Sequence, residues 1–406
     1  MTQVSQKTRN GMSIKGFSLA LAALSSVVWM GTSIFIPGLP EIGRDLSMSS
    51  QELSATLTLY FVSFAAVMIV AGPLSDAWGR RNFVLTGLAL FCLGSLVCPM
   101  ADSGTVFLAG RVIQGLGVGL IQVPTLAMVR DECPGPEAYT VLGLLGAMTA
   151  LIPILSMLIG GVVIEYVGWR VVFYILTGVS IASGFASIYL GETLPKENRP
   201  PRVDFAGSLK NYRDILLSNQ ILLVAGPLLM FAVFQGAYLV ITPLSLQTDF
   251  GLTPTGFAIA NILIIAGIIA GQLSAVRAVK KFPPKKLFVL GAVIGLAGSV
   301  LFSALDMTSS MSHVIIFMAP LTLLGFSFGF IEPISLKSLF AKFKETSGMA
   351  SASYVSLLLI CQGIGSTVAG MLMDGSFSPQ NTLSIMITPL GILMVVLTFS
   401  GRDKLL

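Results

Sequence analysis

The stretch that decides the fold is Gly72-Pro-Leu-Ser-Asp-Ala-Trp-Gly-Arg-Arg81, a short charged sequence between two long apolar segments. It holds Asp76, Arg80 and Arg81, whereas the segments on either side, about 51–75 and 83–101, are almost free of charge. A run of about 20 mostly apolar residues is long enough to cross a membrane as a helix. We therefore predict two membrane-spanning helices joined by a tight, charged loop.

The same pattern extends over the whole chain. Of its 406 residues, 54% are hydrophobic and only 11% are charged, against about 25% charged in an ordinary soluble domain. The apolar runs are continuous and lack the alternation of a membrane β-barrel, so we predict an all-α membrane protein. The predicted spans, about twelve in number, are 17–38, 51–75, 83–101, 105–129, 138–164, 170–190, 220–246, 255–276, 287–305, 313–336, 347–372 and 381–400.

The Lys and Arg residues are distributed unevenly between the two sides that these spans define. With the N-terminus placed in the cytoplasm, all of the 24 basic residues except Arg44, Arg111 and Arg170 fall in the tails or in cytoplasmic loops. Basic loops of membrane proteins face the cytoplasm. We therefore predict that both termini are cytoplasmic.

A polar segment with three prolines, Pro195, Pro200 and Pro201, interrupts the series of spans at its middle. It divides the chain into two halves of six helices, an arrangement that many secondary transporters share. The predicted organisation is a cytoplasmic tail at 1–16, an N-terminal half at 17–190, a flexible cytoplasmic linker at 191–219, a C-terminal half at 220–400 and a second tail at 401–406.

Several classes of function are excluded or disfavoured. There is no GxxxxGK[ST] loop for ATP and no TVGYG-like filter of a potassium channel. The four cysteines form neither a CxxC pair nor a cluster with histidine, so we expect no metal site and no cofactor. We see no nucleophile and base that would suggest an enzyme, and no soluble domain that would bind nucleic acid. Transport would then draw its energy from a gradient.

At this point a resemblance to a known family becomes apparent. Gly72–Arg81 resembles the signature loop of the major facilitator superfamily, G-x-L-a-D-r-x-G-R-r. Four further stretches resemble the Bcr/CflA-type branch of twelve-helix drug:proton antiporters. They are IPGLPEI (36–42), AGRVIQGLG (109–117), Val129-Arg130-Asp131 and GWRVVF (168–173).

The resemblance implies a major facilitator fold with two six-helix halves, and a role for the charged loop. In this family the aspartate and arginine of the loop form a latch that stabilises the outward-facing state, and Asp76 and Arg80 match those positions. Arg81 adds a second basic residue. Gly72 and Gly79 would allow close helix approach and a sharp turn.

Two further motifs of the antiporters have counterparts here. Arg111 matches an arginine that the family links to proton coupling; a charge within the membrane costs about 2.5–3.5 kcal/mol, so we expect it to face a polar cavity. The alternative is that its side chain reaches a nearby interface. Of the helix-five motif Pro153, Gly160 and Gly161 remain, while Ser156 replaces a second proline.

The group that carries the proton must lie at a different position in this chain than in these antiporters. Their first helix often carries an acidic residue at the position of Ser33, so the usual carrier is missing. Glu332 is the one carboxylate well inside a predicted span, and we predict that it binds a proton or a cationic substrate. The alternative is a pairing with Lys337 near the cytoplasmic end of the same helix.

Other polar and aromatic residues within the spans are candidates for a central cavity. Each is also open to a plainer interpretation as a helix–helix hydrogen bond or packing residue. The candidates are Trp29, Ser33, Tyr60, Gln114, Phe231, Gln235, Tyr238, Asn261, Tyr354 and Gln362. The single histidine, His313, is expected at an interface.

We expect from the sequence that the protein moves a small organic compound across the inner membrane by alternating access. The resemblance implies that it exports drugs in exchange for protons and that it works as a monomer within the lipid bilayer. Two alternatives remain. One is transport of a specific metabolite or siderophore, outward or inward. The other is a membrane sensor that transports nothing.

Overall fold

The computed structural model describes residues 8, 11–133, 135, 137–199, 205–219, 221–308, 313–343, 347–375 and 377–401. Helices, turns and loops make up this part of the chain, which contains no β-strand. Twelve helical segments within it are long and apolar enough to cross a membrane, which confirms the prediction from the sequence. The C-terminal tail from 402 and the prolines at 200 and 201 lie outside the described residues.

Residue contacts divide the chain into two compact units. The first consists of Met1–Gly38 and Leu59–Ser208, and the second of Leu39–Thr58 and Leu209–Leu406. The first unit contains α1 (Ile14–Ser33), most of α3 (Ser50–Trp78), α4 (Arg80–Val97), α5 (Gly104–Glu132), α6 (Glu137–Val167) and α7 (Trp169–Leu190). The second contains α2 (Leu39–Asp45), most of α8 (Phe205–Leu216), α9 (Gly226–Thr248), α10 (Pro254–Ala278), α11 (Pro284–Met307), α12 (Val314–Lys342), α13 (Ser347–Asp374) and α14 (Pro379–Gly401).

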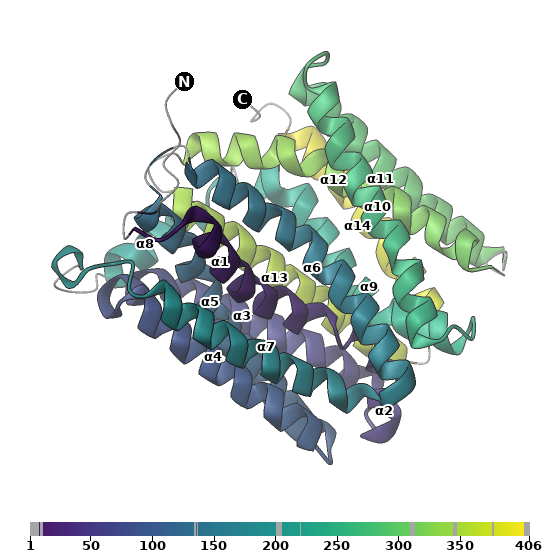
Figure 1. Cartoon of the computed structure of the whole chain (residues 1–406). Helices are drawn as coiled ribbons and strands as arrows, with labels where there is room; N and C mark the ends of the chain where they lie inside the picture. Colours follow the sequence, from purple (N-terminus) through teal and green to yellow (C-terminus); the bar gives the residue numbers. More distant parts are fainter. Residues whose placement is uncertain are drawn as a thin grey trace. The chain divides into compact units, whose positions relative to one another are not determined.

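In the first unit, α1 packs on α6 and α7, and α4 packs on α5 and α7 (Figure 1). Glycines permit these close contacts: a methyl group added at Gly87 or Gly94 would lie 2.7 Å from the carbonyl oxygen of Gly117 or Gly110 on α5. Small residues at helix contacts are how helices associate in lipid, where there is no hydrophobic force between them.

The second unit uses the same principle. Figure 1 shows α10, α11, α12 and α14 side by side, and α9 packs along α13. At the α9–α13 crossing, methyl groups added at Gly236 and Gly365 would clash with the carbonyl oxygens of Gln362 and Val233. The helices of each unit are therefore held in close backbone contact, which a larger side chain at these glycines would disturb.

The outward faces of the helices are apolar rather than charged. On α7, for example, Ile181, Phe185 and Ile188 are all more than half exposed. A soluble protein rarely exposes so large an apolar face. Such faces fit a surface that lipid covers.

The first predicted span differs from the structure at its end. We expected a helix to about 38, but α1 ends at Ser33 and a short 3-10 turn follows at Ile36–Gly38. Pro37 lies within that turn, and a proline has no N–H group with which to continue an α-helix.

The segment expected as a flexible linker contains regular structure. A 3-10 turn occupies Lys196–Asn198, and α8 follows the prolines. The sequence of α8 is amphipathic, with Tyr212 and Ile215 buried while Lys210 and Arg213 are exposed. An apolar stripe at helical spacing stabilises a helix by packing, and we had not recognised it in a polar stretch.

The first turns of α3 belong to the second unit because they bond to the end of α13. The Ser366 hydroxyl donates to the carbonyl oxygen of Ser54 at 2.7 Å, and the Thr58 and Thr367 hydroxyls are 2.9 Å apart. The Asp374 carboxylate accepts from the N–H of Ser50 at 3.0 Å. A carboxylate at a helix N-terminus is well placed, since it satisfies donors that have no partner in the helix.

Gly160 tests the importance of close packing between α1 and α6. A methyl group there would clash with the carbonyl oxygen of Ile34, whereas one at Gly178 on α7 would meet nothing within 4 Å. We predict that Gly160→Ala lowers the free energy of unfolding by about 1–3 kcal/mol, a typical cost of overpacking. Thermal unfolding in detergent measures it, with Gly178→Ala as control. Equal unfolding temperatures for the two variants would contradict the prediction.

Candidate functional sites

The charged loop between α3 and α4 is a tight turn at Gly79. Gly79 has φ of +97°, which favours glycine, and α4 begins at the next residue. A methyl group at Gly79 would also collide with the side chains of Glu192 and Arg199. Glycine is thus required there for two reasons, backbone conformation and close approach. Gly72 lies earlier in α3, about two helical turns before Gly79, and its carbonyl oxygen accepts from the Ser75 hydroxyl at 2.9 Å.

Arg80 joins the ends of three helices. Its guanidinium pairs with Asp76 of α3, and its Nε lies 3.2 Å from Oδ2 of Asp131 of α5. It also donates to the Ser75 hydroxyl at 2.7 Å. Asp76 and Arg80 therefore meet, as the loop sequence indicated, while Arg81 makes no ion pair with any described residue. We call Asp76, Arg80 and Asp131 the latch.

Sequence reasoning missed Asp131 as the third member of the latch. It stood within the stretch Val129–Asp131 that resembles the family, directly after the basic Arg130. The available signal was the position of Asp131 near the end of α5, where a carboxylate can pair with the basic residues of the charged loop. The pairing itself depends on the packing of α4 against α5, which the sequence alone does not give.

Arg111 is fully buried in the first unit. Its Nη1 donates to the carbonyl oxygen of Gly31 at 3.2 Å and to Oε1 of Gln114 at 2.6 Å. The guanidinium carbon also lies 4.1 Å from the ring centre of Phe35 and 4.3 Å from that of Tyr60. Cation–π contacts and hydrogen bonds stabilise a charge removed from water. The alternative in which Arg111 extends to an interface is therefore wrong.

Gln114 and Tyr60 are brought together around this arginine. Gln114 donates to the hydroxyl of Ser95 at 2.8 Å, and the Tyr60 hydroxyl lies 3.4 Å from that of Thr32. Helices α1, α3, α4 and α5 thus all contribute to one buried polar cluster, with Arg111 at its centre.

The two positions at which this chain departs from the antiporter pattern touch each other. The hydroxyls of Ser33 on α1 and Ser156 on α6 are 2.6 Å apart and buried. Ser33 also lies 2.8 Å from the carbonyl oxygen of Trp29, and Ser156 lies 3.1 Å from that of Pro153. A neutral hydroxyl pair therefore lies at Ser33, the position at which the resemblance led us to expect an acid. Gly161 follows Gly160 further along α6.

Glu332 lies within α12, where Gln272 of α10 donates to its Oε2 at 3.0 Å. Lys337 is exposed and makes no ion pair with Glu332, so the alternative pairing is not what the structure contains. The buried hydroxyl of Tyr354 on α13 has no hydrogen-bond partner among the described residues and lies close enough to interact electrostatically with Glu332. Helices α10 and α12 thus meet at a carboxyl group that no described cation neutralises.

The remaining polar candidates of the second unit form pairs between helices. Gln362 of α13 donates to Gln235 of α9 at 2.8 Å, and the Tyr238 hydroxyl of α9 donates to Asn261 of α10. These contacts match the plainer interpretation, in which such residues hold helices together. A substrate cavity built from them stays a prediction.

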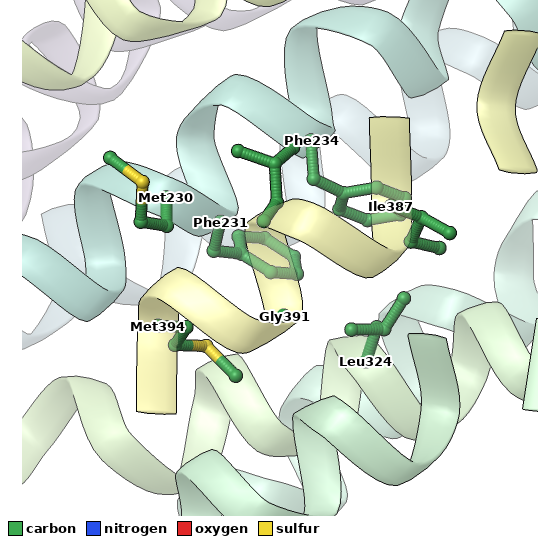
Figure 2. A pocket seen from close by; sticks show the side chains of 8 residues that line it. Met230, Phe231, Phe234, Leu324, Ile387, Gly391 and Met394 are labelled. Carbon is green, nitrogen blue, oxygen red and sulfur yellow. The ribbon is translucent and has the colours of Figure 1, made fainter. Parts of the chain in front are cut away.

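Phe231 lies in an apolar part of the second unit. Its ring stacks on Phe328 with 4.2 Å between centres. Figure 2 shows it in a pocket among α9, α12 and α14. The lining residues are Met230, Phe231, Phe234, Leu324, Ile387, Leu390, Gly391 and Met394. Trp29 is partly exposed on α1, and His313 is exposed directly before α12.

Comparison with known proteins decides the family. The model of the Major Facilitator Superfamily matches residues 21–354, most of the chain. The chain belongs to this superfamily.

Members named for drug resistance are among the similar proteins. This superfamily member is 28% identical over 353 residues to the multidrug resistance protein MdtL of Klebsiella pneumoniae, covering 87% of this chain and 86% of that protein. It is 27% identical over 395 residues to MdtL of Escherichia fergusonii, covering 95% and 96%.

Solved structures support the same fold. The D-xylose-proton symporter matches with a TM-score of 0.68 and 16% identity, over 93% of this chain and 97% of that one. The human organic anion transporter MFSD10 matches with a TM-score of 0.65 and 16% identity, over 95% and 97%. At this identity the likeness establishes the fold alone.

Arg111 offers a test of the buried cluster. A lysine has no planar guanidinium that can lie over the rings of Phe35 and Tyr60 while it bonds Gly31 and Gln114. We predict that Arg111→Lys lowers the free energy of unfolding by about 1–3 kcal/mol, as when hydrogen bonds of a charged group are lost. Thermal unfolding in detergent measures this, with the exposed Arg44→Lys as control. If Arg111→Lys unfolds at the wild-type temperature, the guanidinium contacts do not contribute to the free energy of unfolding and the prediction is wrong.

Proposed function

We propose that this superfamily member is a proton-coupled exporter of small lipophilic drugs that works by alternating access in the inner membrane. The observation that carries the proposal is Glu332, a carboxyl group within α12 that accepts from Gln272 and forms no ion pair with a described cation. A group that carries protons must gain and lose its charge, so its partners must be neutral rather than a fixed cation. The relatives named MdtL support drugs as the cargo.

The Ser33–Ser156 pair supports the assignment of proton binding to the second unit. Neither hydroxyl titrates in the physiological range, so the first helix has no carrier at that place. Arg111 is a permanent charge. Its role in this proposal is to polarise the cluster around Tyr60 and Gln114, while Glu332 carries the proton.

The latch is proposed to stabilise the outward-facing state. With both termini in the cytoplasm, as the basic loops indicate, Asp76, Arg80 and Asp131 lie on the cytoplasmic side. Ion pairs between the ends of α3, α4 and α5 would then oppose opening of that side. The six-helix halves at 17–190 and 220–400, joined by 191–219, are the proposed moving parts, and the working form is proposed to be a monomer.

Transport by the purified protein in liposomes tests the function directly. A pH-sensitive dye inside reports proton flux when tetraphenylphosphonium, a lipophilic cation, or a neutral amphenicol-type drug is added under a proton gradient. We predict drug-dependent proton flux that Glu332→Gln abolishes and Glu332→Asp partly keeps, because aspartate retains a titratable carboxyl group.

Two outcomes would contradict this. Unchanged proton coupling in Glu332→Gln would place the carrier elsewhere. Flux with a siderophore or another metabolite, but with no drug, would favour the specific transporter that the sequence left open. A membrane sensor would move none of these compounds.

The latch has its own test in the same assay. Asp76→Asn removes one of the two carboxylates that pair with Arg80, so we predict a loss of about tenfold or more in transport rate, as expected for a charged partner in a partly buried network. The protein should still reach the membrane. Asp102→Asn, at an exposed carboxylate between α4 and α5, is the control. Full activity of Asp76→Asn would remove the latch from the mechanism.

A further inference from the structure

The segment that follows α7 lies directly against the turn of the latch. Glu192 is 112 residues from Arg80 in sequence, yet its Oε1 accepts from the backbone N–H of Arg80 at 3.0 Å. The same oxygen accepts from the N–H of Leu194 at 3.0 Å, which fixes the carboxylate. Arg80 is the first residue of α4, so Glu192 supplies a partner to an N–H that has none within its own helix.

Arg199 satisfies the other side of the turn. Its Nη1 donates to the carbonyl oxygen of Trp78, the last residue of α3, at 3.3 Å. Its Nη2 lies 3.1 Å from Oε2 of Glu192, and its Nε donates to Leu194 at 3.2 Å. A cation thus meets the C-terminus of α3 and an anion meets the N-terminus of α4, as the two helix dipoles favour.

A third contact reaches the latch itself. The Thr193 hydroxyl donates to Oδ2 of Asp131 at 3.3 Å, the oxygen that also accepts from Nε of Arg80 at 3.2 Å. The side chains of Glu192 and Arg199 are only 26% and 17% exposed. Their ion pair is therefore shielded from water more than an ordinary surface pair, which is worth little.

We propose that residues Glu192–Arg199 form a strap that fastens the latch, in which Glu192 and Arg199 are positioning residues for Arg80. The inference rests on the latch role proposed above and extends it to a segment outside the loop motif. The strap is the first part of the sequence that joins α7 to α8. Movement of that connection would break the contacts of Glu192 and Arg199 with the turn. The latch would then keep its geometry only while the strap stays bound to the turn.

Cys133 provides a native reporter of the strap. It lies two residues after Asp131, and its side chain is only 2% exposed. Burial, with the nearby carboxylates of Glu137 and Glu132, raises the pKa of the Cys133 thiol to about 11. Only thiolate reacts with maleimides, so labelling is slow while the end of α5 stays in place. If the strap leaves the latch, Asp131 loses its contact with Thr193. The end of α5 would then loosen, expose the Cys133 thiol and speed its reaction.

The experiment follows N-ethylmaleimide labelling of Cys133 by peptide mass spectrometry in the purified full-length protein at neutral pH, without drug or proton gradient. We expect Glu192→Ala and Arg199→Ala each to increase the labelling rate about tenfold, consistent with loss of a charge-assisted hydrogen bond. Since the two residues act as one unit, the double variant should label no faster than the faster single variant. Glu197→Ala, an exposed carboxylate in the same segment, should leave the rate unchanged.

A conservative variant separates positioning from general damage. Glu192→Gln keeps a neutral acceptor for the N–H of Arg80 but loses the ion pair with Arg199, so its rate should fall between those of wild type and Glu192→Ala. It also provides the measurement if Glu192→Ala fails to elute as a single species.

Labelling of Cys133 at the wild-type rate in folded Glu192→Gln and Arg199→Ala would overturn the proposal of the strap. A labelling rate in the double variant equal to the product of the two single increases would also overturn it. Because labelling needs no cargo, failure of the drug-export proposal would leave this result standing. Conversely, if Asp76→Asn abolishes transport while the strap variants label normally, the strap alone is wrong.

Discussion

A charged group that enters the apolar interior needs partners, and this constraint organises the rest of the structure. Helices satisfy their own backbone, but Arg111 and Glu332 cannot be satisfied within one helix. Arg111 is held by the carbonyl of Gly31, by Gln114 and by two aromatic rings. Glu332 is held by Gln272 across α10 and α12. These contacts fix which faces of the helices meet, because a rotated helix would leave a charge alone in a low-dielectric surrounding.

Charge outside the spans serves a different purpose from charge within them. Arg80 pairs with carboxylates at helix ends, and the side chain of Asp76 is 43% exposed. A pair that water reaches costs less to break than a fully buried one, so Arg80 can exchange a partner more readily than Arg111. The structure thus combines buried contacts that hold helices together with more exposed contacts at the ends of α3, α4 and α5.

The sequence predicted the fold well because its strongest signal is local. Apolar runs of spanning length identify helices regardless of how they pack, and the twelve spans follow from them. The pairing of Asp76 with Arg80 was also within reach, since the two lie four residues apart on one short stretch. The helix α8 was missed because its apolar residues alternate with polar ones and lie in a polar, proline-containing segment.

The partners from distant parts of the chain could not be predicted in the same way. Gln272 and Glu332 are 60 residues apart, and Ser33 and Ser156 are 123 apart. The local sequence around these residues does not indicate that the two members of each pair are in contact. Their contact depends on the register in which the helices pack. Several polar residues that suggested a cavity, such as Gln235 and Tyr238, bond to neighbouring helices. Polar residues in spans indicate contacts reliably, but they do not distinguish a ligand contact from a helix contact.

The proposal depends most on Glu332 as the group whose proton is exchanged for cargo. The most direct measurement adds tetraphenylphosphonium, which has no proton of its own to release, to the purified protein in lightly buffered detergent solution and follows the pH. The account predicts saturable release of up to about one proton per protein, because binding of a cation is linked to loss of a proton from the same site. It also predicts that Glu332→Gln releases none while remaining folded. Saturable binding without any change of pH, or equal release from Glu332→Gln, would contradict the account.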